Sequence, residues 1–432
     1  MKHRIYSTII AATAISCLTL TGCKDDSTPL PSLAECVFKG KALHMIYCRE
    51  DVPGKVVAFT PGADGHAMLT LSGSFDAADF GIKGMPAIPA AGALPGSPSV
   101  TLDVALTPGD GCYTFSGASE TDFATFSYSG RLESGDSGAD VLTLSLDPVK
   151  LKNQMYAGKV FKPQPLQASV GDILAGKPIK SPFHIVWEGG TIPGLPEQLA
   201  LDPGLLLQAL TLAPVVPAYG NTAYASIAQL FDQAVQTLAL LDNGNIPVRY
   251  FSSKEGASRL MTTPGAMLQY VAGADGSLRI FVNPNSALGL WLVWQSQATW
   301  LPSFFDTAYA DQIKDEIDKG GHQMSEADQK LLQIVADALV KALSPSLVGG
   351  IPMQLSIAGD GVSLYLNTDT CVNFLSLLVK DILAEPAVQQ RVVELLTQYG
   401  VQPEQAAKLL AQLPALLKAT TRVELGLSLL PN

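Results

Sequence analysis

Side chains that could catalyse a reaction or bind a metal are scarce in this sequence and are not grouped. The histidines beyond residue 22 are isolated, and no His-Glu-x-x-His or similar ligand spacing occurs. They are His44, His66, His184 and His322. No Gly-x-Ser-x-Gly segment marks a serine nucleophile, and Gly171–Lys177 is followed by Pro178 where a phosphate-binding loop needs a hydroxyl residue. We therefore expect no enzymatic activity, no metal and no cofactor.

Cys23 is the residue whose surroundings do indicate a reaction. The apolar stretch 5–20 follows Lys2 and Arg4 and is too short to span a bilayer comfortably, as in secretory signal peptides. It ends in Leu20-Thr21-Gly22-Cys23, which resembles a bacterial lipobox, where the cysteine sulfur receives a diacylglyceryl group before the signal is cut. The sequence thus predicts a signal peptide over 1–22 and an acyl anchor at Cys23. The alternative is a plain signal peptide in which Cys23 has no role.

The residues after the cysteine suggest a destination. Lys24, Asp25 and Asp26 resemble the export signal that sends lipoproteins of Bacteroidota to the outer face of the outer membrane. We expect a lipid-anchored outer-membrane protein at the cell surface. The alternative is that it faces the periplasm. Two or three acyl chains would hold it there stably. Residues 23–35, with two prolines, are expected to form a tether.

Composition narrows the range of partners. The chain has 432 residues and a net charge of −11, and losing Lys2 and Arg4 with the signal would make it −13. No basic cluster occurs, so nucleic acid and an anionic membrane face are both expected to be poor partners. Hydrophobic residues make up 47%, yet no apolar run of about 20 residues follows the signal. The expected membrane contact is therefore the acyl anchor.

Two apolar features could bind a ligand. The first is a concentration of aromatic residues, namely Trp291, Trp294, Trp300 and Phe304. These side chains could form a contact in the core, line an apolar ligand site, provide a platform for sugar rings or contact lipid. The second feature is the segment 81–98, rich in Pro, Gly and Ala, with Met85 and Ile88. A loop of this length is expected to be a hydrophobic lid or to pack on the second half.

Four cysteines remain beyond Cys23, and an extracytoplasmic site permits disulfides. Cys36 with Cys48, or Cys48 with Cys112, are the expected bridges because all three lie in the first half of the chain. Cys371 is expected to be a buried thiol in a helix. Their spacing predicts no zinc site.

The hydrophobic pattern predicts an α+β protein. Short runs with two-residue alternation, such as Val100–Leu106, fill the region up to about residue 151 and predict seven or eight antiparallel strands in a barrel or sandwich. We expect this β-rich domain over 36–155 and an α+β domain over 156–432.

The second half shows a possible internal repeat over 222–300 and 325–385. Each copy predicts a helix, an Ile-Pro strand, an Asp-Gly turn, a strand ending in Asn, and a helix. The first of these helices is expected over 222–241. Helices over 386–399 and 403–417 and a strand over 423–429 complete the prediction.

The layout resembles a family of Bacteroidota surface lipoproteins of unknown function, with a calycin-like β-rich front and an α+β back. The residues that carry the likeness are Phe38–Leu43, Gly54–Val57, Ala67–Leu71, Gly244–Pro247 and Gly350–Pro352. The resemblance implies a fold and a location, and it brings no catalytic residues.

These features favour a non-catalytic, lipid-anchored protein that binds an apolar or amphipathic, lipid-like molecule. One alternative is a glycan-binding accessory of a surface uptake system. Another is a structural or protein-interaction lipoprotein. The sequence identifies no protein partner.

Overall fold

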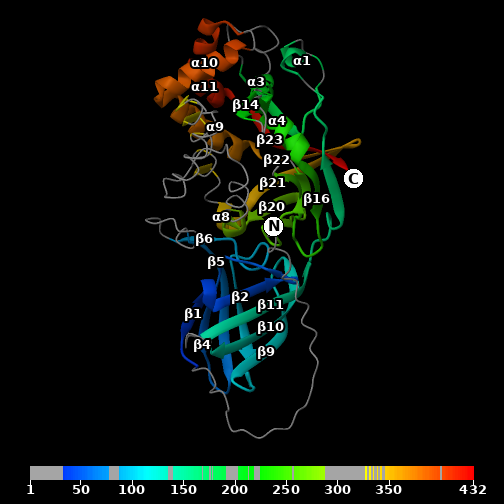
Figure 1. The fold of residues 1–432 in the computed structure, drawn as a ribbon, viewed down its shortest axis with the longest axis vertical. Coiled ribbons are helices and arrows are strands. Elements are labelled where there is room, and N and C mark those ends of the chain that lie inside the picture. Colours follow the sequence, from blue (N-terminus) through cyan, green and yellow to red (C-terminus); the bar gives the residue numbers. More distant parts are fainter. Residues whose placement is uncertain are drawn as a thin grey trace, which may run out of the picture.

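The computed structural model describes most of the chain beyond residue 32. The described residues are 33–76, 87–134, 140–190 without 168, 175, 176 and 178, 203–217 without 213, 224–287 without 255 and 256, isolated positions between 326 and 342, 346–398 and 401–432. They form a β-barrel in the lower half of Figure 1 and a larger curled sheet with helices in the upper half. The expected anchor at Cys23 and the export signal lie outside these residues.

Two sheets wrap around one core to form the barrel. The first sheet has the order β1-β4-β5-β6, with β7 also paired to β5, and the second has the order β3-β2-β11-β10-β9-β8. The strands of the first sheet are β1 (Cys36–Lys39), β4 (Lys55–Pro61), β5 (His66–Phe75), β6 (Ile88–Ala90) and β7 (Ser99–Ala105). Those of the second are β2 (Leu43–Tyr47), β3 (Glu50–Asp51), β8 (Thr107–Pro108), β9 (Cys112–Glu120), β10 (Ala124–Ser134) and β11 (Asp140–Leu151). A single 3-10 turn, Gly40–Ala42, joins β1 to β2.

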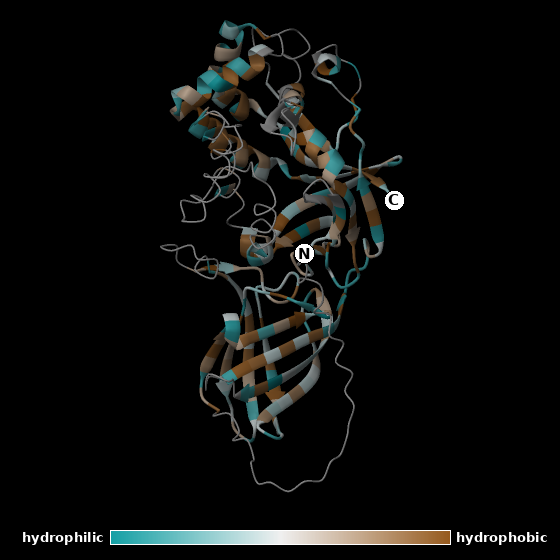
Figure 2. Ribbon diagram, in the orientation of Figure 1, coloured by the Kyte–Doolittle hydropathy of each residue, from teal (hydrophilic) through white to brown (hydrophobic). Residues whose placement is uncertain are grey.

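The barrel strands have the alternation of apolar and polar residues that the sequence predicted. Along β7, Val100, Leu102 and Val104 are buried while Thr101 and Asp103 are exposed. Figure 2 shows the same alternation of apolar and polar residues along the neighbouring strands. Because successive side chains of a strand point to opposite faces, one face fills the barrel and the other meets water. The predicted β-rich, mixed α+β class is confirmed.

One strand pairing differs from the prediction of an antiparallel barrel. β2 and β11 pair in parallel, with Leu43 opposite Leu142 and Tyr47 opposite Leu146. The two strands are far apart in the chain, so their relative direction is not fixed by a short hairpin turn. The other described pairings within the two sheets are antiparallel.

The upper half is built on a ten-stranded sheet. Its order is β18-β17-β16-β12-β23-β22-β21-β20-β19, and β13 also pairs with β23. The strands are β12 (Lys159–Pro163), β13 (Phe183–Glu188), β16 (Val235–Leu240), β17 (Val248–Lys254), β18 (Ala257–Thr262), β19 (Leu268–Ala272), β20 (Ser277–Val282), β21 (Ile351–Ala358), β22 (Gly361–Leu366) and β23 (Arg422–Pro431). A separate pair consists of β14 (Pro214–Pro217) and β15 (Tyr224–Ser226).

The sheet curls so that its last strand, β19, meets the loop between β16 and β17. The amide of Ile246, just before β17, donates to the carbonyl of Leu268 in β19, and the amide of Tyr270 donates to the carbonyl of Gly244. Helices cover part of this sheet (Figure 1). They are α1 (Val170–Leu174), α3 (Pro203–Thr211), α4 (Ile227–Ala234), α8 (Ser346–Gly349), α9 (Thr368–Ala384), α10 (Pro386–Gln398) and α11 (Pro403–Ala419).

A second hydrophobic core joins the last helices to the sheet. Trp187 of β13 and Val423 of β23 are buried with Leu375 and Cys371 of α9. Leu409 of α11 and several residues of α10 belong to the same cluster. The predicted helices over 386–399 and 403–417, the strand over 423–429 and the buried thiol of Cys371 are thus confirmed.

The predicted repeat stays a prediction, because parts of both copies lie outside the described residues, but the described hairpins share one feature. The hairpins β19–β20 and β21–β22 each end in an asparagine that begins a helical turn. Asn283 accepts hydrogen bonds at Oδ1 from the amides of Asn285 and Ser286, and Asn367 accepts one from the amide of Thr370. These are helix N-caps. The helix predicted over 222–241 is wrong in its second part, because it ends at Ala234 and residues 235–240 form β16 between β12 and β17.

The two halves share side chains at their junction. The hydroxyl of Tyr47 in the barrel donates to the carbonyl of Asn243, and the amide groups of Asn283 and Asn285 donate to the carbonyls of Pro53 (3.0 Å) and Ser74 (2.8 Å). One buried apolar cluster also runs from the barrel into the curled sheet. The barrel is therefore held to the upper half by both apolar and polar contacts.

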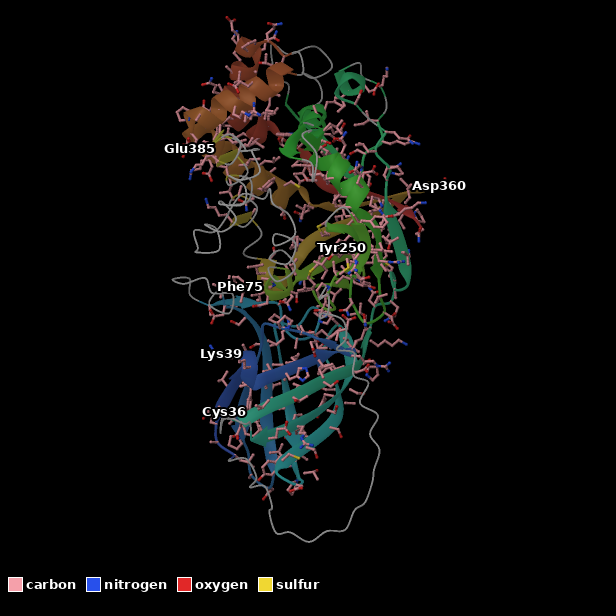
Figure 3. The ribbon with its side chains drawn as sticks, viewed as in Figure 1. Cys36, Lys39, Phe75, Tyr250, Asp360 and Glu385 are labelled. Carbon is pink, nitrogen blue, oxygen red and sulfur yellow. The ribbon has the colours of Figure 1, made fainter. Side chains whose placement is uncertain are left out.

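The described cysteines are free, so neither disulfide expected from the sequence forms in the structure. Cys48 follows β2 at the end of the barrel near the upper half, where its amide donates to Leu146. Cys112 pairs with Glu133 near the end of β10, and Cys36 lies opposite Phe59, low on the barrel in Figure 3. Cys48 is thus at the other end of the barrel from both expected partners.

Candidate functional site

The outer face of β9, β10 and β11 carries small hydroxyl side chains in register. Ser129 on β10 lies opposite Ser116 on β9 and opposite Ser145 on β11. One step along, Arg131 lies opposite Thr114 and Thr143. Because the alternate residues of these strands fill the barrel core, the two rows face outward.

A hollow of about 560 Å³ lies over these two rows. Its lining contains six hydroxyl residues, one arginine and three apolar or small residues. They are Thr107, Thr114, Ser116, Ser129, Thr143, Ser145, Arg131, Ala105, Phe115 and Gly130. Short side chains on three adjacent strands leave this space open, where larger residues would fill it.

Gly130 and Phe115 make the wall thin at this point. They lie opposite each other on the core side of β10 and β9, and a Cβ at Gly130 would overlap the Phe115 ring. The ring therefore packs directly against the β10 backbone, and Phe115 is only 5% exposed. A larger residue at 130 would displace the ring and distort the floor of the hollow.

Arg131 supplies the positive charge of the hollow. Its Nε donates to the Glu133 carboxylate at 2.6 Å, and this hydrogen bond raises the pKa of the Arg131 guanidinium. A guanidinium has five N–H donors, so the bond through Nε leaves others for a bound acceptor. Glu133 at the same time offsets the charge of Arg131, which makes the hollow polar without a strong net charge.

The hollow is suited to binding and lacks the groups for catalysis. Each serine or threonine hydroxyl can donate one hydrogen bond and accept others. Among the described residues that line the hollow there is no histidine, cysteine or carboxylate, so none of them could act as a general base at neutral pH. The arrangement can bind a molecule that carries several hydroxyl groups.

The barrel interior is filled with side chains. Leu69, Leu71, Leu142, Leu144 and Leu146 are each at most 1% exposed. Towards the upper half the core continues through further residues with little exposure, namely Tyr47, Leu94, Ala91 and Ala93. The described barrel core is therefore a packed interior, and its outer face carries the hollow.

The residues predicted to bind an apolar ligand are mostly outside the described part of the chain. Trp291, Trp294, Trp300, Phe304 and Met85 all lie there. Ile88 is described and half-buried. It pairs with Phe75 at the end of β5, so it is part of the first sheet.

A network of charged side chains on β13 and β23 was not predicted. His184 Nε2 is 2.7 Å from one oxygen of Glu424, and Arg422 Nε donates to the other at 2.7 Å. A further nitrogen of Arg422 donates to Glu188 at 2.9 Å. The ring of Tyr365 on β22 lies 4.9 Å from that of His184, because both residues are opposite Gly426 of β23.

Glu424 is the buried member of this network, with 8% of its side chain exposed. Burial raises the pKa of Glu424, but the hydrogen bonds from Arg422 and His184 outweigh burial and hold it below its usual value. No described serine, threonine or cysteine hydrogen-bonds His184, so the network lacks a nucleophile and fits a structural role. In the sequence, this network is indicated only by Glu424, the single acidic residue of the largely apolar strand 422–431.

Lys55 is buried at the junction, and no carboxylate among the described residues forms an ion pair with it. It is 5% exposed, and its Nζ donates to the carbonyls of Ala91 (2.9 Å) and Gly92 (2.8 Å). Burial lowers the pKa of Lys55 from 10.5 to about 8. The side chain holds the segment after β6 against the start of β4, and its enclosure gives it no access to a substrate.

Comparisons with known protein families, curated proteins and solved structures return no match to this chain. The described residues contain no group of three or more His, Cys, Asp or Glu side chains arranged to hold a metal ion. Nor is any described helix long and apolar enough to cross a membrane.

Proposed function

We propose that this protein is a lipid-anchored surface protein that binds a glycan, without catalysing a reaction, in the hollow on the outer face of β9, β10 and β11. The observation that carries the proposal is the convergence of six serine and threonine side chains with Arg131 on a space of about 560 Å³. The anchor is Cys23, and the outer membrane is the proposed location. Both follow from the lipobox and the residues after it.

The size and chemistry of the hollow support an oligosaccharide. Ligand sites typically enclose about 300–1,000 Å³, and most of them are lined by apolar side chains. This hollow has a volume in that range but is open to solvent, and six of its ten lining residues are serine or threonine, which favours a ligand with hydroxyl groups of its own. Because Glu133 offsets Arg131, a neutral sugar suits it better than a highly charged one.

The first experiment is a glycan array probed with the folded protein. Ser129→Trp places a large side chain in the centre of the hollow. The control is Thr125→Trp, which places the same side chain four positions earlier on the same exposed face of β10, away from the residues that line the hollow. We expect the wild type and Thr125→Trp to bind the same glycans and Ser129→Trp to bind none. An array on which the folded wild type binds nothing would remove the proposal.

The lipid-like ligand that the sequence favoured stays a separate prediction. It depends on Trp291, Trp294, Trp300, Phe304 and Met85, which the structure does not describe. Mass spectrometry of a lipid extract from the purified, unacylated protein tests it. Recovery of a stoichiometric lipid would support that function in place of glycan binding.

A further inference from the structure

The hairpin of β17 and β18 extends beyond the strand next to it. β16 pairs with β17 only from Leu238 opposite Val248 to Val235 opposite Tyr250. β18 continues the pairing with β17 as far as Lys254 opposite Ala257. The end of the hairpin therefore lies past the start of β16, at one edge of the ten-stranded sheet.

Both faces of this hairpin carry exposed apolar side chains. Phe251 lies opposite Leu260 on one face, and Tyr250, labelled in Figure 3, lies opposite Met261 on the other. Phe251, Leu260 and Met261 are 41%, 43% and 44% exposed. A hairpin that packs on its own protein needs one apolar face, whereas this one presents apolar groups to both sides.

The hairpin also differs in charge from the rest of the chain. Arg249 and Arg259 are exposed, and one lies on each face. Residues 248–262 hold three basic residues against the single Glu255, in a chain whose net charge is −11. A basic, apolar segment on an acidic protein is complementary to an anionic surface that also offers an apolar layer.

We propose that the β17–β18 hairpin docks in the interfacial layer of a membrane that contains anionic lipids. Phe251, Leu260 and Met261 enter the acyl boundary, and Arg249 and Arg259 contact the lipid phosphates. Both faces of the hairpin are then covered by lipid. This contact is independent of the glycan proposal, since the hairpin and the hollow lie on different halves of the molecule.

Vesicle sedimentation tests the docking. The probe is the chain from Lys24 onward, which contains every described residue but neither the signal nor Cys23. We expect it to sediment with vesicles of phosphatidylcholine and phosphatidylglycerol and to stay in solution with phosphatidylcholine alone. The variants Arg249→Gln and Arg259→Gln should each bind these vesicles about fivefold more weakly than the wild type. High salt should also weaken binding of the wild type.

The apolar contribution is tested with Phe251→Ser combined with Leu260→Ser, which should reduce binding at least tenfold. Val37→Ser is the matched control, because Val37 on β1 is 58% exposed and lies on the barrel. Circular dichroism checks the fold of each variant. If the double variant does not fold, the single variants replace it.

The proposal is overturned if the wild type does not bind anionic vesicles or if the hairpin variants bind them as well as the control does. Self-association that the same substitutions abolish would also overturn it, by assigning the hairpin to a second copy.

Discussion

Ser129 on β10 lies directly opposite Ser145 on β11, on the outer face of the barrel sheet. Ser116 on β9 extends the same row to a third strand. Cross-strand neighbours on one face lie within about 5.5 Å of each other at Cβ, so three small side chains in a row leave a shallow space above the backbone. The candidate glycan site depends on this row and on the parallel row through Arg131.

Filling the row should abolish binding and leave the fold intact. Ser129→Trp adds a large side chain on the solvent side of β10, where substitutions usually change the free energy of unfolding by about 0.5 kcal/mol or less. We expect glycan binding to fall at least 100-fold. Urea unfolding checks the stability of the variant, and Thr125→Trp gives the effect of an exposed tryptophan outside the hollow.

Tyr47→Phe should weaken the junction between the two halves. It removes the hydroxyl that donates to the carbonyl of Asn243 and leaves that carbonyl without this partner. The bond is only partly buried, so its loss should lower the free energy of unfolding by about 0.5–1.5 kcal/mol. Tyr113→Phe is the control, since the Tyr113 hydroxyl makes no hydrogen bond to the described residues. Equal unfolding free energies for Tyr47→Phe and the wild type would contradict this account of the junction.

Lys55 should make stability depend on pH in the alkaline range. Burial lowers the pKa of Lys55 to about 8 in the folded protein, while an exposed lysine in the unfolded chain titrates near 10.5. Between these values unfolding takes up a proton, so the free energy of unfolding rises with pH, by up to about 1.4 kcal/mol per unit.

Chemical denaturation at a series of pH values measures this effect. The wild type should gain stability relative to Lys55→Met from pH 8 to 10.5, and the difference should be constant below pH 8. Lys150→Met, at an exposed position of β11, should show the wild-type dependence. Parallel pH profiles for the wild type and Lys55→Met would show that the amine of Lys55 is not enclosed as described.

Glu424 should stabilise the protein at neutral pH and lose this effect in acid. Its folded pKa lies below the usual value, so its contribution is present above about pH 4.5 and disappears as the pH falls through the folded pKa. We expect Glu424→Gln to lower the free energy of unfolding by about 1–3 kcal/mol at pH 7, because hydrogen bonds from Arg422 and His184 are weakened.

The difference between Glu424→Gln and the wild type should shrink below pH 4.5. Glu188→Gln is the control, since the Glu188 side chain is 56% exposed and its ion pair with Arg422 should contribute about 1 kcal/mol or less. A difference for Glu424→Gln that stays the same at pH 3 would rule out a role for the charge.

The hydrophobic pattern of the sequence correctly predicted those helices and strands whose structure is determined by residues close together in the chain. The alternation Val100–Leu106 and the two helices that begin at Pro386 and Pro403 are examples. The helix expected over 222–241 shows the limit of this reasoning. Its apolar spacing fits a helix, yet Val235–Leu240 has partners on both sides in the curled sheet, and these tertiary contacts decide its structure.

The candidate site could not be predicted because it exists only in the register between strands. Ser116, Ser129 and Ser145 are ordinary surface residues in the sequence, and nothing local shows that they align across β9, β10 and β11. The buried position of Lys55 depends likewise on the carbonyls of Ala91 and Gly92, far along the chain. Aromatic residues and histidines attracted attention in the sequence, whereas the hollow is built from serine and threonine.

Cys23→Ala should remove the stable attachment of the protein to the membrane. The predicted acyl chains are attached through the Cys23 sulfur, so the variant should incorporate no radiolabelled palmitate, and a high-salt wash, which weakens the proposed hairpin contact, should release it from the outer-membrane fraction. Protease treatment of intact cells then distinguishes the surface from the periplasmic face for the wild type. Palmitate labelling that persists in Cys23→Ala would contradict the predicted anchor.

Binding of a glycan in the hollow can be measured by calorimetric titration with the strongest oligosaccharide from the array. The wild type, Thr125→Trp and Ser129→Trp are titrated under identical conditions. Binding of one oligosaccharide per chain by the first two proteins, and none by Ser129→Trp, is the predicted result. Unchanged affinity in a folded Ser129→Trp would contradict it, because the ligand would then bind elsewhere on the molecule.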